Sequence, residues 1–444
     1  MIQQIAFCIV SIFALGFAGW QFINIRRNIL LGQSEKLELN AAQSWRNVLL
    51  VAFGQQKMFK NWIPAVFHFF IYAAFVITQI ELIEIFLDGF TGIHRFFAPM
   101  LGGFYTFVIS FIEILSLLAF VATVIFLIRR NILKINRFEK PEMHGWPQRD
   151  ANIILMLEIV LLIGIFSMNG ADTLLQSIDS QHYPDTGKLA VSSWLGPAFF
   201  GGMSEGALHL TERFGWWLHI LTVFAFLNYL PISKHLHILL AFPNTYFARQ
   251  KPRGEMDNMP EIMNEVKAMM GLAEPTDTTE LPEFGANDVF SLSWKNLLDA
   301  YSCTECGRCT AACPANLTGK KLSPRKIMMD IRDRAEEAGQ NLRKGKDEFK
   351  KDPALPLTKD NYQDGKSLFD YISREELHAC TTCNACVEAC PVLINPLEPI
   401  LKMRRYEILT ESAGPAEWMP LFNSIENGGS AWAMSVDRDA WARE

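Results

Sequence analysis

Apolar residues are concentrated in the first 250 positions of this chain, where they form five long runs. The runs occupy residues 2–25, 62–87, 101–128, 150–170 and 212–232. Each is long enough to cross about 30 Å of hydrocarbon as an α-helix, so the pattern predicts five transmembrane helices. The fourth run is the weakest, because polar residues begin at Asn169. The first run lacks a basic leading segment and a small-residue cleavage site, which favours an anchor over a signal peptide.

Lysine and arginine are distributed unequally among the loops that join these runs. The loops over residues 26–61, 88–100, 129–150 and 171–211 contain six, one, six and one of them. The loops rich in Lys and Arg are expected on the cytoplasmic side. The pattern therefore predicts a bacterial inner-membrane protein with its N-terminus outside and everything after the fifth run in the cytoplasm.

The composition changes near residue 250 from membrane-like to soluble-like. By composition the chain divides into a membrane domain (1–250), a linker or docking segment (251–295), a cysteine-rich domain (296–410) and a tail (411–444). The tail contains Trp418, Trp432 and Trp441, which predict docking on a partner subunit or packing on the chain's own domain. The net charge of −6 and the lack of a basic stripe exclude a nucleic-acid partner.

Eight of the nine cysteines form two runs with the same spacing, C-x2-C-x2-C-x3-C-P. This spacing is typical of bacterial ferredoxins with two [4Fe–4S] clusters, in which the fourth cysteine of each run ligates the other cluster. The rule assigns one cluster to Cys303, Cys306, Cys309 and Cys390, and the other to Cys380, Cys383, Cys386 and Cys313. Zinc knuckles or a disulfide scaffold are the alternative, but zinc sites use two short ligand pairs. Cluster thiolates also belong in a reducing compartment, which agrees with a cytoplasmic location.

A helical pattern follows each cysteine run and indicates an internal duplication. Pro324 to Arg332 and Pro396 to Arg404 have the same separation. In the first helix, Ser323 is the expected N-cap and Gly339 the expected end. Residues 340–365 are rich in Lys, Asp and Gly and predict a solvated insertion.

Histidine within a membrane span is costly, so each one is a candidate ligand. His68 lies in the second run, near its cytoplasmic end, and His219 and His237 lie eighteen positions apart at opposite ends of the fifth. Five helical turns, about 27 Å, separate this pair and place both on one helix face. The geometry suits two stacked haem b groups held between helices. The alternative is that these histidines are interfacial or hydrogen-bonded packing residues.

The inner pair of ligands is predicted more completely than the outer pair. His68 and His237 lie at matching depth, with His235 as a rival for the second position. For His219 the predicted partner is His94, which lies in the short outer loop and could fold back onto the span. His209 is a weaker candidate.

Several carboxylates also fall within the apolar runs. They are Glu81, Glu84, Asp88, Glu113 and Glu158. Acids at membrane depth often mark proton routes, and those near the outer face suggest proton exchange with a quinone there. Carboxylates kept neutral by pairing within the bundle are the alternative.

The five runs, the histidine positions and the stretch P-I-S-K-H-L-H (Pro231–His237) resemble the gamma subunit of respiratory nitrate reductase and the membrane cytochrome b subunit of heterodisulfide reductase. In that family the last span supplies one ligand to each of two b haems, which implies His219 and His237. The second span supplies the other two; His68 matches one of them, and Thr78 stands where the other is expected. The cysteine-rich half resembles iron–sulfur subunits of heterodisulfide reductases.

Together these features predict an all-α bundle of five transmembrane helices, followed by a mainly α-helical ferredoxin-like domain. The predicted role is an electron-transfer subunit that connects membrane quinone, haem b and two [4Fe–4S] clusters with a cytoplasmic partner of the cysteine-rich CCG type. The chain has no glycine-rich nucleotide fingerprint and no doubled C-C-G segment, so the soluble substrate is assigned to another chain. The direction of electron flow stays open. The alternative function is a haem-free, membrane-tethered iron–sulfur sensor or scaffold.

Overall fold

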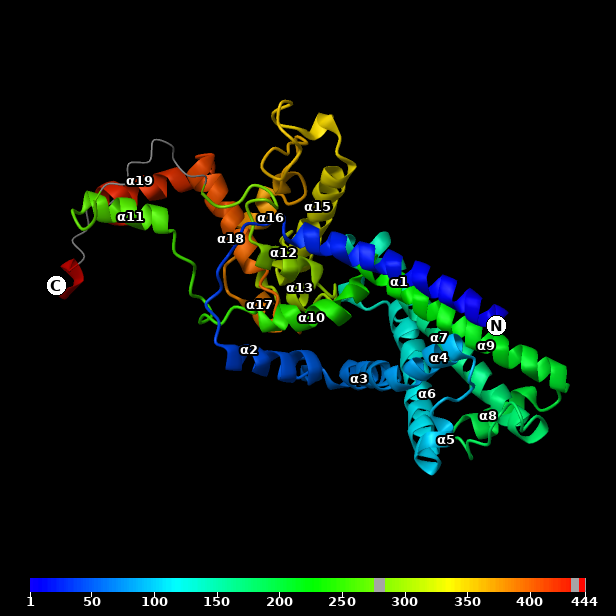
Figure 1. Ribbon diagram of the computed structural model, residues 1–444. Coiled ribbons are helices and arrows are strands. Elements are labelled where there is room, and N and C mark those ends of the chain that lie inside the picture. Colours follow the sequence, from blue (N-terminus) through cyan, green and yellow to red (C-terminus); the bar gives the residue numbers. More distant parts are fainter. Residues whose placement is uncertain (275–283, 433–438, 444) are drawn as a thin grey trace.

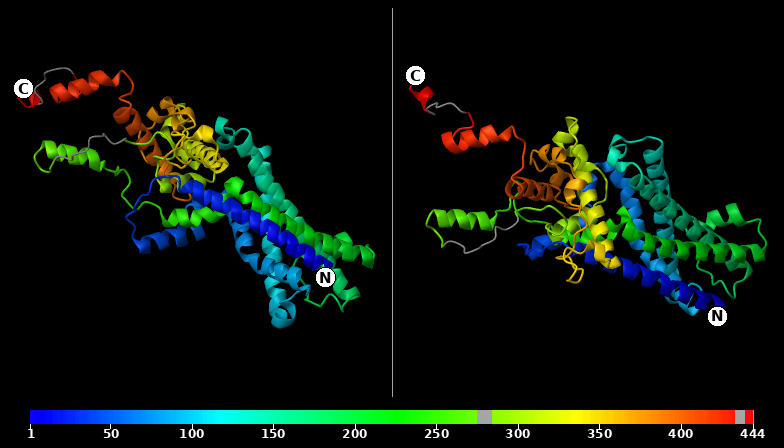
Figure 2. Two further views of the ribbon diagram at one scale, coloured as in Figure 1. Left: turned by 45° about the horizontal axis from the view of Figure 1, so that its top comes forward. Right: turned by 90° about the horizontal axis from the view of Figure 1, so that it is seen from above.

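The computed structural model describes residues 1–274, 284–432 and 439–443, and within these residues it is helical with no strand. A bundle of long helices carries a second helical lobe at one end (Figure 1). The two further views show the same arrangement, with the N-terminus at the opposite end of the bundle (Figure 2). We call the end that adjoins the lobe the cluster-side end and the opposite one the far end.

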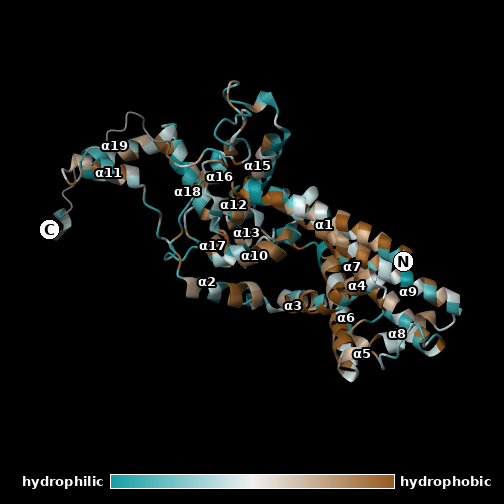
Figure 3. Ribbon diagram, viewed as in Figure 1, coloured by the Kyte–Doolittle hydropathy of each residue, from teal (hydrophilic) through white to brown (hydrophobic). Residues whose placement is uncertain are grey.

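Five helices are long and apolar enough to cross a membrane, as the hydrophobic runs predict. They are α1 (Ile2–Ile29), α3 with α4 (Trp62–Ile77 and Gln79–Thr91), α6 (Gly103–Asn131), α7 (Trp146–Ile178) and α9 (Glu205–Tyr229). Their ribbons are coloured mainly as hydrophobic in Figure 3, and many of their large apolar side chains are exposed, as contact with lipid requires. Shorter helices lie in the connections: α2 (Ala41–Asn47), α5 (Ala98–Leu101) and α8 (Ser192–Phe200).

The fourth span is longer than its apolar run predicts, and the second span is divided. Helix α7 continues past Asn169 to Ile178, because Asn169 and Asp172 point into the bundle and are almost fully buried. Helices α3 and α4 meet at Thr78. Segment α3 packs against α6, whereas α4 packs against α1. The second span therefore changes neighbours halfway across.

Helices α7 and α9 form the most extensive helix pair of the bundle, and two glycines allow their close approach. A Cβ atom on Gly215 would lie 2.6 Å from the backbone N of Met168 and 2.8 Å from the carbonyl O of Gly164. Small residues at such positions let helices in membranes pack backbone against backbone.

The lobe is built from α12 (Trp294–Tyr301), α13 (Arg308–Ala312), α14 (Pro314–Leu317), α15 (Pro324–Lys344), α16 (Arg374–His378), α17 (Ala385–Ala389) and α18 (Leu397–Arg405). Its apolar core extends into the bundle, because Ile25 and Ile29 of α1 belong to the same cluster of buried side chains. Asn28 of α1 donates to the hydroxyl of Tyr301 over 2.9 Å and accepts from Arg343 over 2.6 Å. Residues 286–292, at the end of the predicted linker, include Ala286, Val289 and Leu292 in this core.

The prediction that Gly339 ends the first repeat helix is wrong. Ser323 accepts from the backbone of Lys326 as the N-cap, but α15 continues to Lys344 and is closed by Gly345 in the left-handed conformation. A Cβ atom on Gly339 would lie only 2.0 Å from Oδ1 of Asn28. This glycine therefore makes room for α1 instead of stopping the helix.

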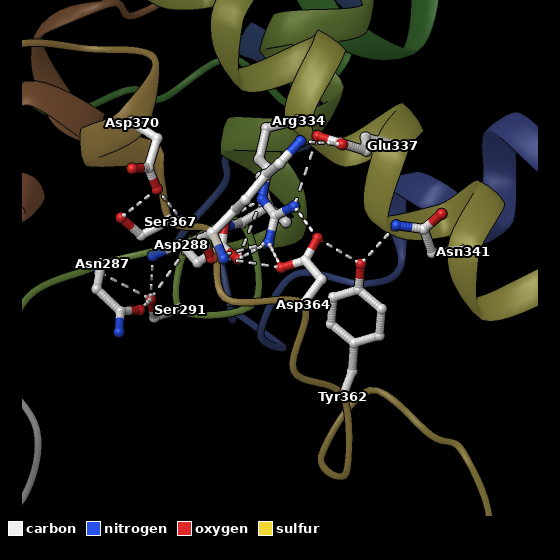
Figure 4. A network of polar contacts seen from close by, with 12 residues as sticks. Asn287, Asp288, Ser291, Arg334, Glu337, Asn341, Tyr362, Asp364, Ser367 and Asp370 are labelled. Carbon is white, nitrogen blue, oxygen red and sulfur yellow. Dashed lines mark hydrogen bonds and ion pairs between the residues drawn. The ribbon is translucent and has the colours of Figure 1, made fainter. Parts of the chain in front are cut away.

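The segment after α15 is less solvated than its composition predicts, because Arg334 holds it (Figure 4). The buried guanidinium donates to Asp364 over 2.6 Å and to Asp288 over 2.6 Å. Tyr362 packs below these groups and donates to Asp364 over 2.7 Å. Charged residues elsewhere in the segment, such as Lys346 and Glu348, are exposed as predicted.

Two helices extend away from the lobe (Figure 1). They are α11 (Pro260–Met269), in the predicted linker, and α19 (Trp418–Gly428) in the tail. Trp418 packs edge-on against the ring of His378 at 4.9 Å, so this part of the tail contacts its own domain. Trp432 and Trp441 are exposed.

Candidate metal centres

The two cysteine loops have the same backbone conformation. The second residue after each first cysteine, Glu305 or Thr382, has a positive φ, and so does the fourth, Gly307 or Asn384. Such left-handed residues turn the chain tightly, so that the loop wraps around its centre. A short helix follows each loop, and these two helices, α13 and α17, pack against each other.

Electrostatic interactions between thiols link the members of each predicted group of cysteines. Cys309 interacts with Cys303, Cys306 and Cys390, and Cys390 interacts in turn with Cys303 and Cys306. Cys386 interacts with Cys380, Cys383 and Cys313, and these four also line one small cavity. Cys309 additionally interacts with Cys386, because the groups are neighbours. Each group takes its fourth member from the other run, as crossed ligation requires; the ligand assignment itself stays a prediction.

Burial makes the thiols poor acids until a metal binds. It raises the pKa of Cys303, Cys386 and Cys390 to about 12. Iron binds thiolates, so cluster assembly displaces these protons. Cys383 is exposed, and the second group is therefore the one that reaches the protein surface.

Each loop is held by an arginine of the helix that follows it. Arg332 of α15 donates to the carboxylate of Glu305 over 2.9 Å. Arg404 of α18 donates to the carbonyl O of Cys380 over 2.6 Å and to that of Leu377 over 2.9 Å. The repeated separation from proline to arginine is the sequence signal for this duplication, but it does not reveal what the arginines hold.

Three imidazoles meet at the cluster-side end of the bundle. His68 comes from α3, His235 from the turn Lys234–Leu236 and His237 from the start of α10 (His237–Tyr246). The rings of His235 and His237 are 5.8 Å apart, and His68 interacts electrostatically with both.

The His237 ring is oriented for ligation. Its Nδ1–H donates to the carbonyl O of Lys234 over 2.8 Å. This bond leaves Nε2 free to ligate a metal and fixes the plane of the ring. His235 packs against Phe226, and its buried Nδ1 has no hydrogen-bond partner. Imidazoles from different helices fit the ligand set of a b-type haem, with His68 and His237 as the predicted pair.

The first cysteine loop lies directly against this histidine site. Lys234, three residues before His237, donates to Glu305 of the loop over 2.7 Å. Arg308, one residue before Cys309, donates to the carbonyl O of Lys57 over 2.9 Å and interacts electrostatically with His68. The structure thus brings the predicted haem ligands and the first thiol group together.

The two histidines predicted for an outer haem have separate surroundings. The Nδ1–H of His219 donates to the carbonyl O of Leu161 on α7 over 3.2 Å. Nε2 of His94 lies 3.1 Å from Asp172, and its Nδ1 lies 3.8 Å from Asp88. Although burial alone would lower it, bonds to these carboxylates raise the pKa of His94 to about 9. Ligation by His94 stays a prediction.

His94 belongs to a buried ion network at the far end that the sequence does not reveal. Arg95, 4% exposed, donates to Asp172 over 2.7 Å and to Asn169 over 2.7 Å. Asn169 donates to Glu81 over 3.3 Å. Tyr105 also contacts Arg95, and it donates to Glu84 over 2.7 Å. Two of the carboxylates noted in the sequence are thus paired within the bundle.

The membrane-capable helices and the thiol groups indicate a membrane-anchored protein with an iron–sulfur domain. A family model described as "4Fe-4S dicluster domain" matches residues 302–394. The C-terminal half therefore contains such a domain, and iron–sulfur clusters are its cofactors.

Curated relatives agree with this class. The chain is 27% identical to "Probable iron-sulfur-binding oxidoreductase FadF" of Bacillus subtilis, over 94% of this chain and 57% of the relative. It is 26% identical to "EtfAB:quinone oxidoreductase" of Syntrophomonas wolfei, over 98% and 58%. A "Probable membrane-anchored ferredoxin" of Chromohalobacter salexigens is 32% identical over 37% of this chain and 22% of the relative. The chain thus spans less than two thirds of these relatives. No solved structure matches it.

Proposed function

We propose that this chain carries electrons between membrane quinone and a cytoplasmic catalytic partner, through one bis-histidine haem site and two [4Fe–4S] sites. The observation that carries the proposal is the contact between the histidine site and the first cysteine loop, through Lys234 and Glu305. A sensor or scaffold does not require candidate haem ligands beside a cluster loop. The relative described as a quinone oxidoreductase supports quinone as the membrane substrate.

The residues of the chain position these centres. A haem held by His68 and His237 and clusters held by the two thiol groups supply one-electron transfer when bound. Lys234 and Arg332 fix Glu305 and thereby the first loop against the end of the bundle. Arg404 fixes the second loop, whose Cys383 reaches the surface.

A cleft beside the second loop fits the docking of a soluble partner. It measures about 770 Å³ and lies between α2, residues 248–257 and the loop residues Thr382 and Asn384. Arg253, whose side chain is 62% exposed, lies at this cleft and pairs with Glu388. A partner seated here approaches the exposed end of the second thiol group. We propose a cysteine-rich CCG-type subunit, by resemblance to heterodisulfide reductase.

The proposal includes the predicted domain boundaries and the predicted membrane orientation of the chain. The membrane domain (1–250) lies in a bacterial inner membrane with its N-terminus outside, by the distribution of Lys and Arg. The linker (251–295), the cluster domain (296–410) and the tail (411–444) face the cytoplasm. The resemblance to the nitrate reductase gamma subunit and to heterodisulfide reductase subunits is part of the same proposal; the positions of His68, His219 and His237 match it, and Thr78 departs from it.

A reduced-minus-oxidised optical spectrum of the purified full chain tests the proposal. We expect a b-type α band together with the broad absorbance of [4Fe–4S] clusters. His68→Ala and His237→Ala should each remove the haem on the cluster-side end and leave eight non-haem irons, because the thiol groups do not depend on the imidazoles. His144→Ala, at an exposed histidine in a nearby loop, is the matched control. A wild-type protein with clusters but no α band would instead support the haem-free sensor or scaffold.

A further inference from the structure

Resting on the proposed function, we propose that the chain holds a single haem, at the cluster-side end, and that quinone exchanges electrons with the protein on that side of the membrane. The far half of the bundle contains a buried ion network in the region where a second haem would be expected. The inference follows from the surroundings of the histidines, taken one at a time.

A second haem in this bundle needs an imidazole opposite His219. The expected place on the second span is Thr78, where α3 and α4 meet, and a threonine hydroxyl is a poor ligand for haem iron. His219 itself packs against α7, where a Cβ atom on Gly164 would lie 2.9 Å from its backbone N. Because the two backbones are this close, helix α7 occupies the space beside His219 that a haem would need.

His94, the predicted substitute, is held elsewhere by a hydrogen bond at Nε2, and its Nδ1 lies only within ion-pair distance of a carboxylate. Nε2 lies 3.1 Å from Asp172, and Nδ1 lies 3.8 Å from Asp88. Asp172 is fully buried and is also bonded by Arg95. Turning the ring towards His219 would leave this buried carboxylate one partner short, which is costly inside the bundle.

All nine histidines lie within the described residues. The remaining ones have other surroundings than a haem site. His209 contacts Tyr183 at 3.3 Å and Asp179 at 3.6 Å, and His182 pairs with Asp179 at the surface. His144 and His378 lie in a cluster-side loop and in the lobe. The methionine Met168 near His219 belongs to the apolar core around Phe7 and Trp216. Among the described residues, two imidazole rings pack together at the cluster-side end, where those of His235 and His237 are 5.8 Å apart.

This arrangement decides where quinone chemistry takes place. With one haem site, the far half of the bundle has no metal centre to which a quinone bound there could pass electrons. In quinol oxidation the two electrons therefore enter at the cluster-side half, and the two protons leave the quinol on the same side. In this arrangement the ion network around Arg95 has a structural role: it holds α4, α6 and α7 together at the far end.

Haem stoichiometry of the full chain, measured against protein mass and acid-labile sulfide, tests the inference. We expect one haem for every two clusters in the wild-type protein, a measurement that needs no variant. His219→Ala and His94→Gln should keep the full haem content, whereas His68→Ala should lose all of it. His209→Ala serves as a control at the far end.

Two haems per chain, or loss of half of the haem in His219→Ala, would overturn the inference and leave the proposed function standing. Absence of haem from the wild-type protein would instead overturn the proposed function. If His219→Ala does not fold, the wild-type ratio and low-temperature electron paramagnetic resonance still decide the matter. A single low-spin ferric haem signal supports the inference, and two such signals contradict it.

Discussion

Glu305 lies between two cations that come from different parts of the chain. Lys234 donates to it from the turn after the last span, and Arg332 donates to it from α15. Burial alone would raise the pKa of Glu305, but the two cations hold it below its ordinary value. Glu305 is therefore ionised. Its two ion pairs connect the first cysteine loop of the cluster domain to the membrane bundle and to α15.

Arg332→Gln should loosen the first cysteine loop. The change leaves a carboxylate that is 2% exposed with one cation instead of two, which costs about 1–3 kcal/mol. We expect faster loss of absorbance near 400 nm from one cluster when the purified protein is exposed to a chelator. Lys344→Gln, at an exposed cation on the same helix, is the control. Equal rates in both variants would contradict the role given to Arg332.

Asp330 makes the stability of the cluster domain depend on pH. Burial is the main reason why its pKa rises to about 6, despite Lys326 at 2.8 Å; Glu376 and Asp333 act in the same direction as burial. The folded state therefore binds a proton more tightly than the unfolded state, whose carboxyl titrates near 4. Stability should fall as pH rises from about 4 to about 6 and then level off, by up to about 3 kcal/mol.

Asp330→Asn removes this charge and keeps the shape of the side chain. Thermal unfolding of the variant at pH 7.5 should occur at a higher temperature than in the wild-type protein, and the difference should shrink towards pH 5. Asp360→Asn, at an exposed acid in the segment after α15, should behave like the wild type. A lower unfolding temperature for Asp330→Asn at pH 7.5 would mean that the bond to Lys326 outweighs the cost of burial.

At the scale of whole elements, local patterns predict well and distant contacts do not. The five spans follow from hydropathy, and the dicluster domain follows from a cysteine spacing that lies within twelve residues. By contrast, Asp172 and Arg95 are 77 positions apart and meet only after α7 has packed against the loop before α6. The same holds for Gly339: its sequence context resembles a helix end, but Asn28 of α1 occupies the space beside it. Contacts of this kind depend on how distant helices pack, and a local sequence pattern does not predict that packing.

The pairing of α7 with α9 is expected to depend on Gly215. An added methyl group at this position would meet backbone atoms of α7, which cannot move aside as a side chain can. Gly215→Ala should cost about 1–3 kcal/mol by overpacking and lower the unfolding temperature of the protein in detergent. Gly206→Ala, on the same helix but facing open space, should be neutral or slightly stabilising. Equal behaviour of the two variants would show that the helices separate more easily than the structure indicates.

At the scale of the molecule, the membrane bundle and the cluster domain behave as one body and not as a domain on a tether. Their apolar cores are continuous through Ile25 and Ile29, and polar bonds at Asn28 and Glu305 join them. A fixed relation between the two parts keeps the histidine site beside the first thiol group. The second thiol group is exposed at Cys383, and the residues on either side of it, Thr382 and Asn384, line the cleft.

This geometry makes a prediction about the whole protein in a membrane. If quinone exchanges electrons and protons at the cluster-side end alone, turnover moves no charge across the bilayer. Proteoliposomes that contain the full chain, a water-soluble quinol and a soluble electron acceptor on the cluster side should oxidise the quinol without changing the signal of a membrane-potential dye. A potassium gradient with valinomycin provides the positive control for the dye. A potential that builds with turnover and collapses with an uncoupler would require electrons to cross the far half of the bundle, past the ion network around Arg95.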